Sequence, residues 1–245
     1  IQVRLHVLLK LDALAEWIPL LTDVLLPLVL ELGQDGVWRV RQAVVQAIPL
    51  LAEKLGATFF EEHMVDLYLK AYEDSVHEVR ASASEGLPLL CKACGSDWVL
   101  EKLVPRIRAF YDGASFYLIR ITVVNAFKRL VTGTPPTKSS GGGGGDSGTG
   151  GSGGAANAVG PNGGSDGAAA SPMLAPHVID LMLRAAQDQI PNVRFTAVRA
   201  LQEMAPHLDD AAVASQVRPI LAGLAQQDSD QDVKFFAAAA LASLR

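Results

Sequence analysis

Two cysteines, Cys91 and Cys94, form a CxxC arrangement, which can serve redox chemistry or bind zinc. A redox pair needs the N-terminal end of a helix, where the helix dipole lowers the pKa of the attacking thiol. A structural zinc site needs two further ligands at matching spacing, and the sequence has no second CxxC and no HxxxH. Because this CxxC falls in the last turn of an expected helix, we interpret both cysteines as packing residues.

The histidines are scattered, and none pairs with a plausible nucleophile. They are His6, His63, His77, His177 and His207. A stack of helices rarely supplies the strained turn that presents a catalytic nucleophile. We therefore expect no catalytic residue, no metal and no cofactor, and we predict that the protein is not an enzyme. The alternative, a hydrolase or a redox enzyme that uses the CxxC, would require an activated thiol.

Composition and charge limit the classes of partner. The 245 residues are 49% apolar and carry a net charge of -5 without any block of like charges. This balance argues against nucleic acid and anionic membranes as partners. The longest apolar runs, such as residues 24–30, are far shorter than the roughly 20 residues that span a bilayer. Two cysteines are too few for a disulfide framework, so we expect the protein to be located in a reducing compartment, the cytoplasm or the nucleus.

The elements that position the candidate side chains are amphipathic helices. After Trp38, apolar or small residues recur three or four positions apart at Val40, Val44 and Ala47, and Gly56 ends the stripe. The same reading along the chain predicts helices over residues 1–15, 23–33, 37–55, 58–72, 76–94, 97–111, 116–132, 172–186, 191–206, 210–226 and 230–244.

A unit of about 40 residues recurs along the chain. Each unit has an acidic turn residue, a short polar bridge and a basic anchor that opens an amphipathic helix. The anchors are Arg4, Arg41, Arg80, Arg120, Arg194 and Lys234, at successive intervals of 37, 39, 40, 74 and 40. Removing the glycine-rich residues 135–171 shortens the 74-residue interval to 37. This period predicts an all-α fold, an α-solenoid of HEAT repeats built from antiparallel helix pairs.

The expected organisation has three parts. Residues 1–134 form a partial first repeat and three further HEAT repeats, residues 135–171 form a Gly/Ser-rich disordered insert, and residues 172–245 form two C-terminal HEAT repeats. The insert lacks apolar side chains that could offset the entropy of ordering it. Its glycines do not predict a phosphate-binding loop, because no strand precedes them and no Gly-Lys-Ser or Gly-Lys-Thr follows.

Aspartates stand six positions before most anchors, at Asp35, Asp74, Asp188 and Asp228. Such a residue can accept hydrogen bonds from the next helix start, and stacking brings its carboxylate near a neighbouring arginine. We expect a structural ladder that sets the register of the repeats, made of Asp35, Arg41, Asp74, Arg80, Arg120, Asp188, Arg194, Asp228 and Lys234. Asp112 departs from this six-residue spacing, because it precedes Arg120 by eight positions.

Bulky side chains mark the turns between the two helices of a unit. They are Trp38, His77, Phe116 with Tyr117, and Ile190 with Pro191. Stacking would line these turns along one ridge, where aromatic and arginine anchors concentrate binding energy. We predict that a protein partner binds there. The alternative is that Trp38 only covers the corner between two helices.

Several motifs carry a family resemblance. The segments GVWRVR (36–41), PLLA (49–52), NVRF (192–195) and DVKFFA (232–237) resemble the scaffolding (A, structural) subunits of protein phosphatase 2A. The resemblance covers nearly the whole chain outside the insert. It implies an all-helical solenoid of which about the C-terminal third is present.

The resemblance also implies partners. It implies that the phosphatase catalytic subunit docks on the turns at Trp38, Arg39, His77, Tyr117 and Ile190, and that His77 replaces an expected tyrosine. A regulatory B-type subunit would bind only through repeats absent here, and the phosphatase metal ions would belong to the catalytic subunit. The alternative is another HEAT adaptor, similar to nuclear-transport receptors, that binds basic signals through its concave face.

Overall fold

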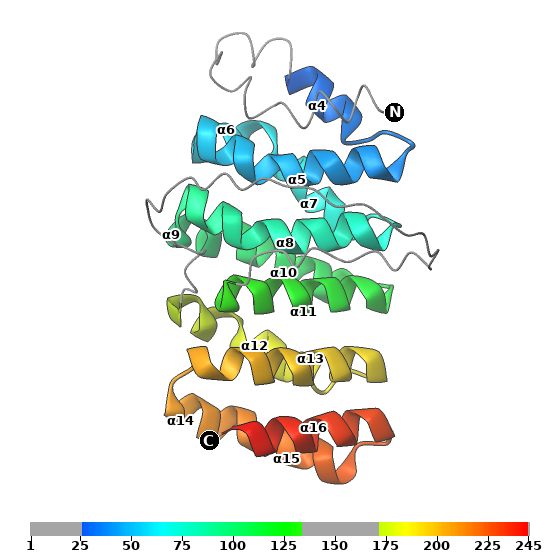
Figure 1. The fold of residues 1–245 in the computed structure, drawn as a ribbon, viewed down its shortest axis with the longest axis vertical. Helices are drawn as coiled ribbons and strands as arrows, with labels where there is room; N and C mark the ends of the chain where they lie inside the picture. The colour runs from blue at the N-terminus through cyan, green and yellow to red at the C-terminus, as the bar shows by residue number, and fades with distance from the viewer. Residues whose placement is uncertain (1–25, 134–171, 245) are drawn as a thin grey trace, which may run out of the picture.

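The computed structural model describes residues 26–133 and 172–244. Two layers of helices stack along one axis, from α4 (Leu26–Leu32) at one end to α16 (Gln231–Ser243) at the other (Figure 1). Within these residues the secondary structure is helical, with no strand. The predicted all-α solenoid is confirmed.

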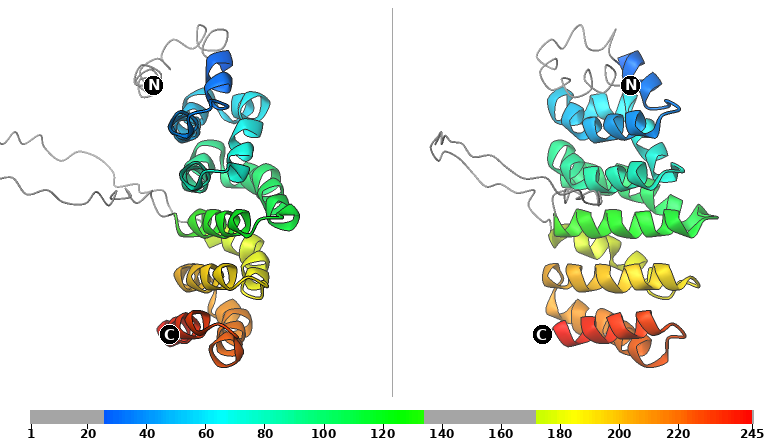
Figure 2. Two further views of the ribbon diagram at one scale, coloured as in Figure 1. Left: turned by 90° about the vertical axis from the view of Figure 1, so that its right-hand side faces the viewer. Right: turned by 45° about the vertical axis from the view of Figure 1, so that its right-hand side comes forward.

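The inner layer is a column formed by the second helix of each repeat unit. In the described ranges it consists of α5 (Trp38–Leu55), α8 (His77–Cys94), α11 (Tyr117–Thr132), α13 (Pro191–Met204) and α16. Consecutive members pack directly against each other, and the left panel of Figure 2 shows them nearly end-on. Each buries one side: Val40, Val44 and Ile48 of α5 are four positions apart and all inaccessible.

The outer layer consists of shorter helices. They are α4, α6 (Ala57–His63), α7 (Val65–Lys70), α9 (Ser96–Trp98), α10 (Val104–Gly113), α12 (Ala175–Ala185), α14 (Asp210–Ala212) and α15 (Arg218–Gln227). A proline is the second residue of α4, α10, α12 and α15. At a free helix start the missing N–H costs no hydrogen bond, because the first helical N–H groups have no acceptor within the helix, but α10 and α15 follow directly on other helical turns.

Two outer segments share an irregularity that corrects the helices expected over 97–111 and 210–226. A π-helical turn, Val99–Leu103, joins α9 to α10, and a second one, Val213–Val217, joins α14 to α15. Pro105 and Pro219 each lie six positions after the first residue of the preceding π turn. A proline cannot donate to the carbonyl four residues back and clashes with it, and a wider turn relieves both problems.

The helix expected over 58–72 is also corrected. It is divided into α6 and α7 at Met64 and ends in a 3-10 turn, Ala71–Glu73. Phe60, Met64 and Tyr68 are all buried, so the break keeps both pieces against the core. No glycine or proline marks it. The other described inner and outer helices agree with expectation within a few residues, with 3-10 turns at Pro172–Leu174 and Ala205–His207.

Some predictions lie outside the described residues. They are the helix over 1–15 with Arg4 and His6, the start of the helix over 23–33, and the disordered insert over 135–171. The helices that flank the insert in sequence can still be compared. Inner helix α11 packs on α13 as α5 packs on α8, so the 74-residue interval contains one step of the stack.

Candidate functional site

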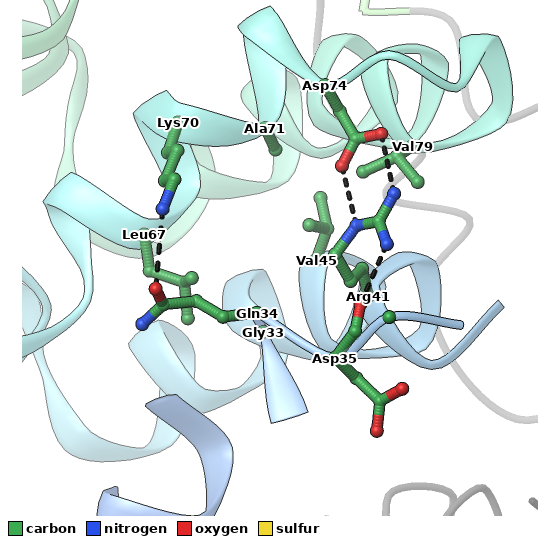
Figure 3. Close-up of a pocket in the computed structure, with 11 residues that line it drawn as sticks. Gly33, Gln34, Asp35, Arg41, Val45, Leu67, Lys70, Ala71, Asp74 and Val79 are labelled. Carbon is green, nitrogen blue, oxygen red and sulfur yellow. Dashed lines mark hydrogen bonds and ion pairs between the residues drawn. The ribbon is translucent and has the colours of Figure 1, made fainter. Parts of the chain in front are cut away.

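An arginine–aspartate clamp links α5 to the next repeat. Arg41 donates through Nε and Nη2 to the two carboxylate oxygens of Asp74, at 2.7 and 2.9 Å (Figure 3). Its Nη1 donates to the backbone carbonyl of Asp35 at 2.7 Å. The two-point contact fixes the plane of the guanidinium as well as its position. The clamp therefore ties an inner helix to the turn of its own repeat and to the turn of the next one.

The same clamp recurs at two more junctions. Between α11 and α13, Arg120 binds both oxygens of Asp188 at 2.8 and 3.0 Å. Between α13 and α16, Arg194 binds both oxygens of Asp228 at 2.7 and 2.6 Å. Nη1 of these arginines donates to the carbonyls of Ala114, at 3.3 Å, and Asp188, at 2.9 Å. The interaction is thus repeated atom for atom along the stack.

The ladder aspartates also stabilise the turns. One carboxylate oxygen of each accepts the backbone N–H two residues later, at 2.8 to 2.9 Å: Asp35 from Val37, Asp74 from Val76, Asp188 from Ile190 and Asp228 from Asp230. This local turn precedes the start of each inner helix. Each of these aspartates therefore stabilises the turn of its own repeat. Asp74, Asp188 and Asp228 also bind the arginine of the preceding repeat.

The clamps lower the pKa of their aspartates. Burial alone would raise the pKa of Asp74, but hydrogen bonds from Arg41 and from the N–H of Val76 outweigh burial and leave the pKa below its ordinary value. The pKa values of Asp188 and Asp228 are lowered by the same opposition between burial and hydrogen bonding. The folded state therefore favours the ionised carboxylates.

The junction between α8 and α11 lacks this clamp. Arg80 makes the usual contact with its own turn, donating through Nη1 to the carbonyls of Asp74 and Ser75 at 2.6 and 3.1 Å. Its residue is only 4% exposed, and its Nε has no hydrogen-bond partner within the described part of the chain. Ala114 stands six positions before Arg120, where the other turns have aspartate.

Asp112, the acidic residue two positions earlier, does not replace the missing carboxylate. It accepts from Arg184 of α12 at 2.6 Å, on an exposed part of the outer layer. At the C-terminal end of the ladder, Lys234 makes a smaller electrostatic contribution to the low pKa of Asp228. The ladder predicted from sequence thus has three clamps, an unmatched Arg80 and a terminal lysine within the described residues.

The predicted binding residues lie along the edge where the inner helices begin, at the right of Figure 1. Trp38, His77, Tyr117 and Pro191 are the first residues of α5, α8, α11 and α13, and Ile190 precedes α13 directly. We call this row the turn edge. Each of its first residues stands three positions before an arginine of the ladder.

The turn edge is partly exposed. Arg39 is exposed and lies over the ring of Trp38, 4.4 Å from the ring centroid, a distance typical of a cation–π contact. Trp38 itself is half-buried and packs on the core, so it covers the helix corner and also supports Arg39. Phe116 is 53% exposed and packs on Tyr117 with ring centroids 5.6 Å apart. Bulky side chains are therefore available to a partner.

Cys91 and Cys94 occupy the last turn of α8 as half-buried free thiols. Burial raises the pKa of both, that of Cys94 to about 11, which is opposite to thiol activation. Among the described residues no group of three or more His, Cys, Asp or Glu side chains could hold a metal ion. No helix in those ranges is long and apolar enough to cross a membrane.

A groove of about 650 Å³ follows α5, α8 and α11 on the inner layer. We call it the inner groove. It is lined by Gln42, Gln46, His77, Glu78, Arg80, Ala81, Ser82, Ser84, Glu85, Leu118, Ile121, Thr122, Asn125 and Arg129. The sequence alone does not predict this groove, because its walls come from three repeats. The one indication of the groove in the sequence is the spacing of 40 residues between Gln42, Ser82 and Thr122.

Comparison with known proteins supports the fold and gives a partial likeness. The HEAT-repeat pattern matches residues 25–55 and 178–208. The chain is 42% identical over 59 residues to the serine/threonine-protein phosphatase PP2A 65 kDa regulatory subunit of Drosophila melanogaster, covering 24% of this chain and 10% of that protein. It is 44% identical over 55 residues to the beta isoform of the phosphatase 2A 65 kDa regulatory subunit of Homo sapiens, covering 22% and 9%.

The matched segments therefore span about a tenth of the length of these curated relatives. Among solved structures, the crystal structure of Cex1p has a TM-score of 0.59 at 13% sequence identity, covering 97% of this chain and 38% of that chain. At this identity the likeness concerns the fold alone. The described chain is an α-solenoid of HEAT repeats.

Proposed function

We propose that this stack of HEAT repeats is a non-enzymatic scaffold that binds the catalytic subunit of a protein phosphatase 2A-type holoenzyme. The proposed contact is the turn edge, with Trp38, Arg39, His77, Tyr117 and Ile190 as its main residues, and Pro191 beside them. A solenoid presents many turns in one row, which suits a large protein partner better than a small molecule.

The observation that carries the proposal is the row of bulky helix-start side chains on an edge with clamps at two of its three junctions. Arg39 is exposed and lies over Trp38, a contact that reduces the side-chain entropy to be lost on binding. Arginine and tryptophan are among the residues that most often dominate interface energies. The partial identity with the 65 kDa subunits supports a phosphatase as the partner.

The experiment is a binding titration of the full chain against a purified phosphatase 2A catalytic subunit. We expect Arg39→Ala to lose about 2 kcal/mol of binding free energy, roughly a thirtyfold loss of affinity, with an unchanged circular dichroism spectrum. The matched control is Arg106→Ala, which removes an arginine of outer helix α10 that pairs with Asp66. Equal affinities of both variants would reject the turn edge, and a wild-type chain that does not bind would reject the function.

A second candidate function, an adaptor for basic signals, has one observation in its favour. The inner groove is lined by amide side chains from two helices, Gln42 and Gln46 on α5 and Asn125 on α11. Such amides can bind the backbone of an extended peptide. Saturable binding of a lysine- and arginine-rich peptide, weakened by Gln46→Ala, would favour this adaptor over the phosphatase scaffold.

A further inference from the structure

The ladder alternates acidic and basic side chains except at one junction. The charges of both Arg41 and Arg80 help to lower the pKa of Asp74. In the same way, the charges of Asp228 and Asp188, on either side of Arg194 along the ladder, help to raise the pKa of Arg194. Between Arg80 and Arg120 the corresponding position is Ala114. Two cationic side chains therefore follow each other along the ladder without a carboxylate between them.

The turn residue at this junction has an extended backbone, as it has at the clamps. Ala114 has φ −67° and ψ 111°, close to φ −57° and ψ 140° at Asp74 and to φ −59° and ψ 146° at Asp228. Its carbonyl also accepts Nη1 of Arg120, as the carbonyl of Asp74 accepts Nη1 of Arg80. The turn therefore keeps the carbonyl contact of the clamps and lacks their carboxylate.

No nearby acid of the described chain fills the position. The oxygens of Asp74 accept from Nε and Nη2 of Arg41. Glu85, which lines the inner groove, pairs with Arg129 at 3.2 Å, and Glu78 is exposed to solvent. The guanidinium of Arg80 is thus a buried cation whose Nε has no acceptor, and an unmet buried donor of this kind costs free energy that an external anion would recover.

Arg80 is reached from the inner groove. Arg80 lines the groove together with His77 and Leu118, at the starts of α8 and α11. His77 belongs to the turn edge and lies one helical turn before Arg80. A protein that docks on the turn edge therefore covers the mouth of this site.

We propose that Arg80 forms a carboxylate-binding site at the α8–α11 junction, filled by an acidic side chain of the docked protein partner. The partner's carboxylate takes the position that Asp74, Asp188 and Asp228 hold in the three clamps, accepting from Nε and Nη2 of the arginine. This inference rests on the proposed function for the identity of the partner, the phosphatase catalytic subunit. The site itself follows from the chain alone.

The test compares the wild-type chain with Ala114→Asp, which supplies the carboxylate internally, and with Ser115→Asp, which adds the same charge one residue away. We expect Ala114→Asp to raise the melting temperature by about 3 °C and Ser115→Asp to leave it unchanged. Sodium acetate should raise the melting temperature of the wild type and of Ser115→Asp by about 1 °C relative to sodium chloride at equal ionic strength. It should not raise that of Ala114→Asp.

Affinity for the catalytic subunit is the second readout. Ala114→Asp should weaken binding about tenfold, because its own carboxylate occupies Arg80, while Ser115→Asp should stay within about twofold of wild type. Equal responses of all three chains to acetate would overturn the site. A specific acetate response with unchanged affinity of Ala114→Asp would overturn the role of the partner's carboxylate. A wild-type chain that does not bind the subunit would reject the proposed function. The melting temperatures in acetate would then still test whether Arg80 forms a carboxylate-binding site.

Discussion

The junction between α13 and α16 and the junction between α8 and α11 solve the same packing problem with different polar contacts. In the first, Arg194 and Asp228 form a buried two-point ion pair. In the second, the hydroxyl of Ser84 donates to the carbonyl of Thr122 at 3.2 Å, Arg129 pairs with Glu85, and Arg80 stays unmatched. Both pairs of helices still pack directly. Apolar burial therefore stacks the repeats, and the clamp adds orientation and charge balance.

The largest expected effect comes from breaking a clamp. Asp228→Ala should lower the free energy of unfolding by about 3 kcal/mol, because it leaves the guanidinium of Arg194 buried and unpaired. The measurement is urea denaturation followed by circular dichroism. The matched control is Asp112→Ala, which removes an exposed pair with Arg184 and should cost less than about 1 kcal/mol. Equal losses would mean that the clamp does not stabilise its junction.

Acid should weaken the clamped junctions selectively. The folded-state pKa values of Asp74, Asp188 and Asp228 are lowered, so their stabilising contribution is complete above the unfolded pKa of about 3.9 and is lost as the pH falls through the folded values. The stability difference between wild type and Asp228→Ala should therefore shrink below about pH 4. Urea titrations at pH 7 and at successively lower pH values test this, and a constant difference would contradict it.

The smallest effect is expected at the unclamped junction. Arg80→Met removes a guanidinium that makes no ion pair with a carboxylate in the described chain and whose Nε has no acceptor there, so the free energy of unfolding should stay within about 1 kcal/mol of wild type. Arg194→Met, in contrast, leaves the carboxylate of Asp228 buried and should cost about 3 kcal/mol. The comparison uses urea denaturation of the two variants at pH 7. Equal losses would remove the distinction between the two junctions.

Much of the candidate site follows from sequence because repeats impose a period. The interval of about 40 residues places Trp38, His77 and Tyr117 at equivalent helix starts, and the structure has them there. The aspartates six positions before the anchors indicate the ladder without coordinates. The eight-residue offset of Asp112 and the alanine at position 114 already mark the irregular repeat, but only the structure shows that Nε of Arg80 has no acceptor in the described chain.

The inner groove and the breaks in the outer layer could not be derived in this way. The walls of the groove meet only after three inner helices are stacked, so no local pattern defines it. The break at Met64 has no glycine or proline to announce it. Local propensity leaves such a break undecided, and burial of Phe60 and Tyr68 against neighbouring helices determines it.

By itself the sequence determined the helical period, the apolar face of each inner helix and the residues available for an acidic and basic ladder, because all three depend on spacing along one chain. Only the tertiary structure decided which carboxylate each arginine binds. Arg41 and Arg194 reach aspartates 33 and 34 positions away, and Arg120 reaches one 68 positions away. These pairings depend on how far apart stacked helices lie, and that distance is set by side-chain packing across the junction.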